Sequence, residues 1–251
     1  MTALAFSKGD MASRPPLPTE SVVRAGVVHC LGVALTFPAV ALVDGHPDSL
    51  AWGLRWDTWT RSLPVEAAPV ALLVYVAMVL WHLVFRSADA KKAAKTWADA
   101  PGSGVTTTLV VWNYALMVMS LFLLVGCGQA ALAIVRDSRS GAAVSLVCDG
   151  TTMWAAPRTG TLWQLAFMWS KFPELLDTVL LVVRGRPVIF LHWYHHVTVL
   201  LYCWAVVRCD FPGIIFSVMN AFVHCIMYVC YEYYGHGNCV WVWGGGGGNN
   251  V

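Results

Sequence analysis

The run PVIFLHWYHHVTVLLYCWAVV, residues 187–207, decides the fold class of this chain. It contains no Asp, Glu, Lys or Arg, and it is long enough to cross a bilayer, which takes about 20 residues in a helix. The whole chain has the same character, because 58% of its 251 residues are hydrophobic and only 12% are charged. A soluble domain carries roughly 25% charged residues. The composition therefore predicts an integral membrane protein rather than a soluble globule with one large core.

Apolar segments of similar length recur along the chain. They predict an all-α, polytopic integral membrane helical bundle with five clear spans, at residues 64–85, 106–135, 160–183, 187–207 and 212–233. The stretch 25–43 is also apolar but contains His29 and Pro38, so it is compatible with an N-terminal span, an interfacial segment or a signal-anchor. Two loops are expected on the cytosolic side because they carry the basic residues Arg86, Lys91, Lys92, Lys95, Arg184 and Arg186.

Polar side chains inside three consecutive predicted spans are spaced as neighbours on a helix. The first set is Lys171, Glu174, Asp177 and Thr178, with Gln164 two turns earlier. The second set is His192, His195 and His196, and the third is Asn220, His224, Tyr228 and Tyr231. Each set alone has a simpler explanation: a self-satisfied ion pair near the membrane boundary, hydrogen-bonded core histidines or an aromatic packing seam. Together they predict three walls of one buried reaction centre.

Two chemistries would explain such a cluster of histidines. In the first, they hold iron or zinc as in histidine-box desaturases and hydroxylases, with Glu174, Asp177 and His224 as further ligands. Those enzymes carry several separated boxes, whereas the eight histidines of this chain form only one. In the second, a neutral imidazole attacks a thioester and holds the acyl group, while another histidine carries the proton. The residues alone leave both chemistries open.

Three motifs in this region resemble those of the ELO-type fatty acid elongases. KFPELLDT (171–178) is similar to the KxxExxDT motif of that family, and HWYHH (192–196) matches its HxxHH box. NAFVHCIMYVCY (220–231) is similar to the NxxxHxxMYxYY motif, except that Cys230 replaces a tyrosine. The motifs agree in type, order and spacing, and the resemblance covers about residues 60–234.

The resemblance implies a multi-pass, seven-helix enzyme of the endoplasmic reticulum membrane. Such a very-long-chain 3-oxoacyl-CoA synthase is an acyltransferase that condenses acyl-CoA with malonyl-CoA to 3-ketoacyl-CoA, releasing CO2 and CoA. This is the first step of fatty acid elongation, and it requires no metal or dissociable cofactor. The expected partners are acyl-CoA, malonyl-CoA, membrane lipid, the reductases and dehydratase of the elongation cycle and, as an option, a second copy of the chain. No nucleic acid partner is expected.

Roles for individual residues follow from the matching motif positions. His195 is the expected acyl-accepting nucleophile, and His224 is its expected partner in the condensation. The other expected catalytic residues are His192, His196, Asp177 and Glu174. The expected substrate-binding residues are Lys171, Thr178, Asn220, Tyr228, Tyr231 and Gln164. No metal ligand is expected in this interpretation.

The resemblance also divides the chain into three parts. Residues 1–59 form an N-terminal segment with a polar tail and a possible hydrophobic helix, and residues 60–234 form the transmembrane catalytic domain. Residues 235–251 are a low-complexity tail with a run of five glycines, which is not expected to form a helix. Because the family has two more spanning helices after the third motif, we expect a chain truncated at the C-terminus. An inactive truncated paralogue is therefore another alternative to the condensing enzyme.

Overall fold

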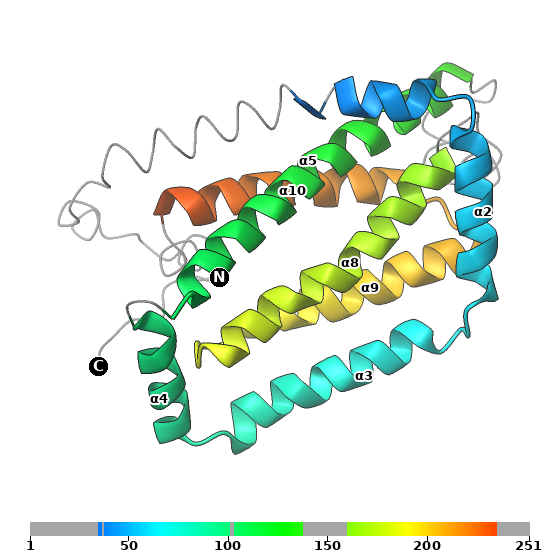
Figure 1. Ribbon diagram of the computed structural model, residues 1–251. Coiled ribbons are helices and arrows are strands. Elements are labelled where there is room, and N and C mark those ends of the chain that lie inside the picture. The colour runs from blue at the N-terminus through cyan, green and yellow to red at the C-terminus, as the bar shows by residue number, and fades with distance from the viewer. Residues whose placement is uncertain (1–34, 37, 101–102, 138–159, 235–251) are drawn as a thin grey trace, which may run out of the picture.

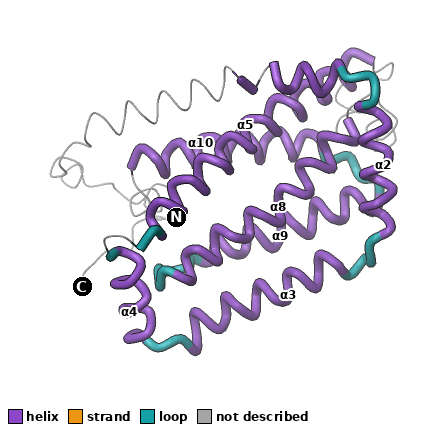
Figure 2. Tube along the Cα trace, in the orientation of Figure 1, coloured by secondary structure: helices purple, strands orange, loops and turns teal. Residues whose placement is uncertain are grey.

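The computed structural model describes residues 35–36, 38–100, 103–137 and 160–234. Within these residues every regular element is helical (Figures 1 and 2). The helices are α2 (Ser49–Ser62), α3 (Ala67–Leu80), its π-helical continuation η1 (Trp81–Phe85), α4 (Ala88–Asp99), α5 (Val105–Asp137), α8 (Gly160–Val183), α9 (Phe190–Cys209) and α10 (Ile214–Tyr234). The all-α fold class predicted from the sequence is therefore confirmed.

Each of the five predicted spans corresponds to a long helix. The helices α3 with η1, α5, α8, α9 and α10 begin and end within a few residues of the predicted limits. Successive long helices run in opposite directions through the bundle (Figure 1). Of the additional stretch 25–43, residues 35–36 and 38–43 are helical, and the remainder lies outside the described residues.

The helix α8 lies at the centre of the bundle. It packs against α5 and α9, and it also contacts α2, α3 and α10. The outer helices of the bundle are α10, which packs on α5, and α3, which packs on α9. The helix that carries the KFPELLDT motif is therefore the one best placed to meet side chains from all the others.

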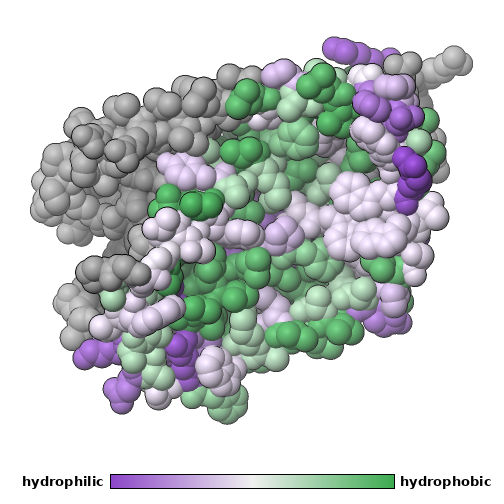
Figure 3. Space-filling view, in the orientation of Figure 1, coloured by the Kyte–Doolittle hydropathy of each residue, from purple (hydrophilic) through white to green (hydrophobic). Residues whose placement is uncertain are grey.

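Two helical stretches of the described chain are long and apolar enough to cross a membrane by composition alone, Ala67–Phe85 and Thr107–Arg136. The helices α8 and α9 are not among these two stretches, because α8 contains three charged residues and α9 contains three histidines. Lys171 and Glu174 of α8 are only 3% and 1% exposed, so these charges do not face lipid. Figure 3 shows hydrophobic surface across the middle of one face and hydrophilic residues towards the edges near α2 and α4.

Two shorter helices, α2 and α4, lie across opposite ends of the bundle (Figure 1). The helix α4 occupies a stretch for which the sequence predicted only a basic loop. It begins where the Ser87 hydroxyl accepts a hydrogen bond from the Ala90 N–H at 3.2 Å, an N-cap contact. At the other end, the Arg208 guanidinium of α9 donates to the carbonyl oxygens that close α2, those of Thr60, Arg61 and Leu63, at 3.3, 2.9 and 3.1 Å.

Candidate active site

A buried ion pair on α8 forms one side of the site. The Lys171 Nζ lies 2.6 Å from Glu174 Oε1, one helical turn away, and the Lys171 ammonium also sits 4.2 Å from the centre of the Phe167 ring. Lys171 donates a second hydrogen bond to Asn220 Oδ1 of α10, at 2.8 Å. The pair is therefore not self-contained at a membrane boundary, as the simpler explanation required. It is buried and joined to a neighbouring helix.

Two histidines from different helices meet beside this pair. The Nε2 atoms of His195 on α9 and His224 on α10 are 3.4 Å apart, so one ring donates and the other accepts. The Nδ1 atom of His224 faces Glu174 Oε2 at 3.6 Å, which is longer than a hydrogen bond. A proton on Nδ1 is favoured there by attraction to the carboxylate. His224 then presents the lone pair of its Nε2 to the N–H of His195.

The other two histidines of the box pack beside the first. The rings of His192 and His196 are 4.7 Å apart and meet edge to face, and the rings of His195 and His196 are 5.8 Å apart. His196 also meets the edge of the Tyr75 ring of α3, at 6.5 Å. Nε2 of His192 is buried and has no hydrogen-bond partner among the described residues. The predicted convergence of all three box histidines with His224 is thus present in the structure.

Asp177 occupies a different part of the site from His195 and His224. One carboxylate oxygen accepts a hydrogen bond from the indole N–H of Trp112 on α5 at 2.6 Å, and the other accepts from the Tyr228 hydroxyl on α10 at 2.9 Å. The Tyr228 ring in turn meets the His224 ring edge to face, at 5.8 Å. Asp177 therefore ties α5, α8 and α10 together and reaches the histidines through Tyr228, while Glu174 is the carboxylate that faces a histidine.

Two aromatic residues that the sequence did not single out, Tyr75 and Trp112, contact the site. Tyr75 shares a hydrogen bond with the Thr178 hydroxyl at 2.7 Å, and Trp112 donates one to Asp177. Both aromatic residues lie within apolar helices, away from the membrane interfaces where Trp and Tyr gather. A buried Trp or Tyr needs a partner for its polar atom, and this is the signal in the sequence that could have pointed to them.

Two expected substrate-binding residues are not part of this cluster as described. Gln164 is fully buried, but its Oε1 accepts a hydrogen bond from Ser217 of α10 at 3.0 Å rather than contacting a histidine. It lies two helical turns before Lys171, which is roughly 10 Å along the axis. The side chain of Tyr231 lies outside the described residues, so its role stays a prediction.

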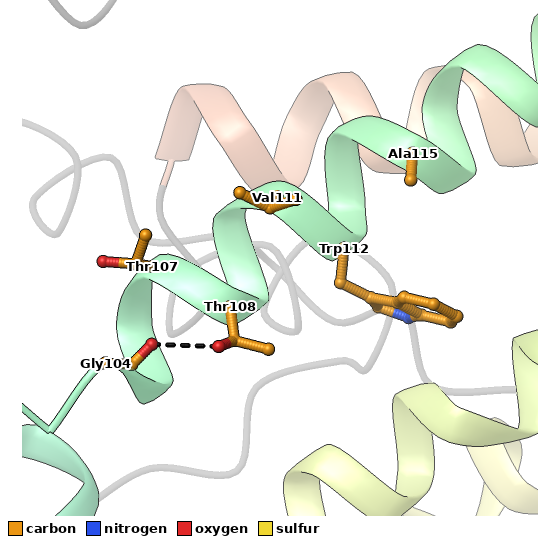
Figure 4. Close-up of a pocket in the computed structure, with 6 residues that line it drawn as sticks. All are labelled: Gly104, Thr107, Thr108, Val111, Trp112 and Ala115. Carbon is orange, nitrogen blue, oxygen red and sulfur yellow. Dashed lines mark hydrogen bonds between the residues drawn. The ribbon is translucent and has the colours of Figure 1, made fainter.

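A pocket opens on α5 beside the Asp177 contact. It has a volume of ≈ 500 Å³ and is lined by Gly104, Thr107, Thr108, Val111, Trp112 and Ala115. Figure 4 shows the Trp112 ring extending from α5 towards the neighbouring yellow-green helix, α8. One tryptophan therefore forms both a wall of the pocket and a hydrogen bond to a site carboxylate.

Metal coordination was one of the two chemistries open from the residues. Among the described residues, no group of three or more His, Cys, Asp and Glu side chains is arranged to hold a metal ion. His195 and His224 instead contact each other directly, at the distance of a hydrogen bond.

Comparison with known families matches residues 63–243 to the family described as ELO: GNS1/SUR4 family. This chain belongs to the ELO family. The three motifs that predicted the family, KFPELLDT, HWYHH and NAFVHCIMYVCY, all lie inside the matched residues. The family assignment made from these motifs is therefore confirmed, whereas the three-part division of the chain stays a prediction.

Individual relatives of this ELO-family chain carry elongase names. It is 36% identical over 151 residues to fatty acid elongase 1 of Trypanosoma brucei brucei, covering 59% of this chain and 48% of the relative. It is 55% identical over 71 residues to fatty acid elongase 3 of Trypanosoma cruzi, covering 28% and 24%. It is 40% identical over 124 residues to very long chain fatty acid elongase 6 of Gallus gallus, covering 49% and 45%. The chain thus spans less than half the length of each of these relatives. No solved structure matches it.

Proposed function

We propose that this ELO-family chain is the condensing acyltransferase of fatty acid elongation, which joins acyl-CoA and malonyl-CoA to a 3-ketoacyl-CoA. The observation that carries the proposal is the contact between the half-buried His195 and the buried His224, whose Nε2 atoms are 3.4 Å apart. The elongase names of the relatives support the same reaction class.

In the first half-reaction, the lone-pair nitrogen of the His195 ring attacks the thioester carbon of acyl-CoA. The proton on His195 Nε2 moves to His224 Nε2 as the new C–N bond forms, and the C–S bond breaks. His224 then gives this proton to the departing thiolate, so the products are a neutral acyl-imidazole and free CoA. Glu174 stabilises the transient imidazolium of His224 through the 3.6 Å contact at Nδ1.

In the second half-reaction, malonyl-CoA loses CO2 and its α-carbon attacks the acyl group held on His195. The C–N bond breaks, His195 regains a proton and 3-ketoacyl-CoA leaves, so the complete cycle takes up one proton. The oxyanion needs a hydrogen-bond donor. Asn220 suits this role, because Lys171 engages its carbonyl oxygen and leaves the NH2 as the donor end. Tyr228 suits it less, because its hydroxyl proton is donated to Asp177.

The neighbouring residues have supporting roles in this proposal. His192 and His196 orient the ring of His195 by packing against one another and against it, while Thr178 and Tyr75 support His196. In both half-reactions, bond formation and proton transfer involve only the imidazole groups and the substrates, while Glu174 and Asn220 stabilise charge. We therefore propose that neither a metal nor a dissociable cofactor takes part.

The cellular setting follows from the same proposal. Acyl-CoA and malonyl-CoA reach the enzyme from the cytosol, and we propose the endoplasmic reticulum membrane as its location. A reductase must act next on the 3-keto group, followed by a dehydratase and a second reductase. A homo-oligomer also stays a proposal.

The test is a microsomal assay of the 251-residue chain with labelled malonyl-CoA and a panel of acyl-CoA thioesters. We expect 3-ketoacyl-CoA that forms equally well with a metal chelator and falls to background in His195→Ala. His46→Ala is the matched control, because His46 is exposed and stacks on Trp52 away from the site. With acyl-CoA alone, the wild-type protein should release about one CoA per chain, the signature of a covalent intermediate.

Each outcome discriminates between the alternatives. Activity retained in His195→Ala would remove that residue as the nucleophile, and 3-ketoacyl-CoA formation lost with chelator would overturn the metal-free mechanism. No product from protein correctly inserted in the membrane would overturn the proposal for this chain and favour a non-catalytic paralogue.

A further inference from the structure

A second cluster of charged groups lies at the end of the bundle where α4 crosses it, outside the histidine site (Figure 1). Arg184 and Arg186, in the turn between α8 and α9, both reach Asp99, the last residue of α4. Nη2 of Arg184 is 3.3 Å from the carboxylate, and Nη2 of Arg186 is 2.9 Å from both of its oxygens. We call these three residues the arginine cluster.

The arginine cluster carries more positive charge than its single carboxylate balances. The pKa of Arg184 is lowered by desolvation and then by the charge of Arg186, and Asp99 only partly opposes this. Two further cations lie close by, because Arg86 and Lys91 both interact electrostatically with the neighbouring His82. Like charges concentrated at a partly buried position repel one another, and an anion would relieve that repulsion.

Both arginines also have donors without an acceptor. Among the described residues, Nε of Arg184 and Nε of Arg186 are buried and have no hydrogen-bond partner. Arg184 as a whole is only 7% exposed, so its guanidinium cannot turn freely to water. A buried charged group with an unsatisfied donor is unfavourable for the folded protein. A bound oxyanion would accept from these donors.

We propose that the arginine cluster binds a phosphate group presented at the membrane surface. Guanidinium groups match phosphate oxygens with paired N–H donors, and basic pockets between helices on the cytosolic side suit lipid headgroups. The same chemistry has two sources here, the headgroup of an anionic phospholipid or the phosphate of a soluble nucleotide carrier. Binding of a lipid headgroup is independent of the acyl-transfer reaction proposed above, whereas binding of the nucleotide carrier rests on that proposal, because CoA carries both substrates.

The position of the cluster links this phosphate site to the histidine helix. The carbonyl oxygen of Arg186 lies 3.0 Å from Nε2 of His82, and α9 begins four residues later at Phe190. Gly185 has a φ of +63°, and a Cβ there would overlap the Lys91 carbonyl oxygen, so the turn lies tightly against α4. A phosphate held by both arginines would steady the segment that leads into HWYHH.

The test measures binding to the full chain in nanodiscs. One arm uses phosphatidylcholine discs with and without phosphatidic acid and measures the lipid retained by the protein. The other uses adenosine 3′,5′-bisphosphate with phosphatidylcholine discs and measures its Kd. Arg184→Gln and Arg186→Gln should each weaken binding of the probe that binds the wild-type protein by roughly tenfold, which is the effect of losing one charged hydrogen bond. Lys92→Gln is the control, because it removes an exposed charge of α4 that is not in the cluster.

A variant with the opposite effect separates binding from a structural role. Asp99→Asn removes the carboxylate that competes with phosphate for both arginines, so it should strengthen binding several-fold. A cluster that only fastens α4 would not gain affinity in this way. Saturable binding of one probe that is weakened in both arginine variants and strengthened in Asp99→Asn identifies whether the phosphate comes from a lipid or from a nucleotide. The proposal is overturned if neither probe binds, or if the three variants of the arginine cluster bind like the wild-type protein.

Discussion

At the scale of single residues, the Lys171–Glu174 pair is the feature that most needs an explanation. Its side chains are 4% and 2% exposed in a helix of a membrane protein, where desolvation of two charges can exceed the attraction between them. Stability alone therefore does not account for the pair. Its contacts do, because Glu174 faces His224 and Lys171 holds Asn220.

Separate and combined substitutions of this pair should divide stability from activity. Lys171→Met and Glu174→Gln should each lower the free energy of unfolding by about 3–5 kcal/mol, because one buried charge is left unpaired. The double variant should recover much of that stability yet form no 3-ketoacyl-CoA. Thermal unfolding in detergent and the condensation assay measure the two effects, and an active double variant would assign the pair to structure alone.

Trp112→Phe tests the contact that the sequence did not reveal. The phenyl ring keeps the apolar surface of the indole but removes the N–H that donates to Asp177 at 2.6 Å. We expect the rate of condensation to fall about tenfold, since a hydrogen bond to a charged group is worth about 1.5–3 kcal/mol. Trp97→Phe on the exposed face of α4 is the control. Equal rates for the two variants would show that Trp112 only packs.

At the scale of helices, α5 and α8 approach closely where one has glycine and the other tryptophan. A Cβ at Gly126 would overlap the Trp163 ring. That ring cannot move aside easily, because its N–H donates to Asp44 at 2.8 Å and it packs edge to face with Phe122, with the ring centres 5.0 Å apart. Small residues allow membrane helices to approach in this way, and this approach brings Trp112 of α5 within reach of α8.

Substituting two glycines of the same helix should therefore have opposite results. Gly126→Ala should lower the free energy of unfolding by about 1–3 kcal/mol, the usual cost of overpacking. Gly128→Ala, where nothing lies within 4 Å of the added Cβ, should be neutral or stabilising by up to about 1 kcal/mol. Thermal unfolding of both variants decides this, and similar values for the two would mean that the Trp163 contact relaxes without cost.

At the scale of the whole molecule, charged contacts fasten both ends of the bundle. At one end, Arg61 of α2 bonds Asp57 at 2.9 Å and Asp210 at 2.6 Å, which joins α2 to the turn after α9. At the other end, Asp99 joins α4 to the turn between α8 and α9. The Arg61–Asp57 pair lies within α2, but the Arg61–Asp210 contact and the Asp99 contacts connect segments that are far apart in the sequence.

The Asp99 contact should make stability depend on pH in acid. Desolvation opposes ionisation of this exposed carboxyl, but the charges and hydrogen bonds of Arg186 and Arg184 hold its pKa below the ordinary value. Because the pKa of Asp99 is lower in the folded protein, the contact stabilises the fold fully at pH values above 3.8, the pKa of this carboxyl in the unfolded chain. This stabilisation is lost as the pH falls through the lower pKa of the folded state. The unfolding temperatures of wild-type protein and Asp99→Asn should therefore differ at neutral pH and converge in acid. A constant difference would contradict this.

Much of the site could be predicted because it depends on spacing within single helices. Offsets of three and four residues put Lys171 with Glu174, and His192 with His195 and His196, on common faces. The helix α4 was missed because its lysines were interpreted only as the sign of a cytosolic loop, although its apolar residues recur at helical spacing. Gln164 was expected near the histidines because it continues the polar stripe of α8, but a stripe two turns long reaches another part of the bundle.

The sequence by itself determined the all-α membrane fold, the family and the polar faces of three helices, because apolar length and helical period are local properties of the chain. Only the tertiary structure decided that Glu174 rather than Asp177 faces His224, that Trp112 and Tyr75 support the site, and that Asp99 meets two arginines. These contacts join residues between 50 and 103 positions apart. Such pairs are set by how whole helices pack and rotate against one another, which no local spacing determines.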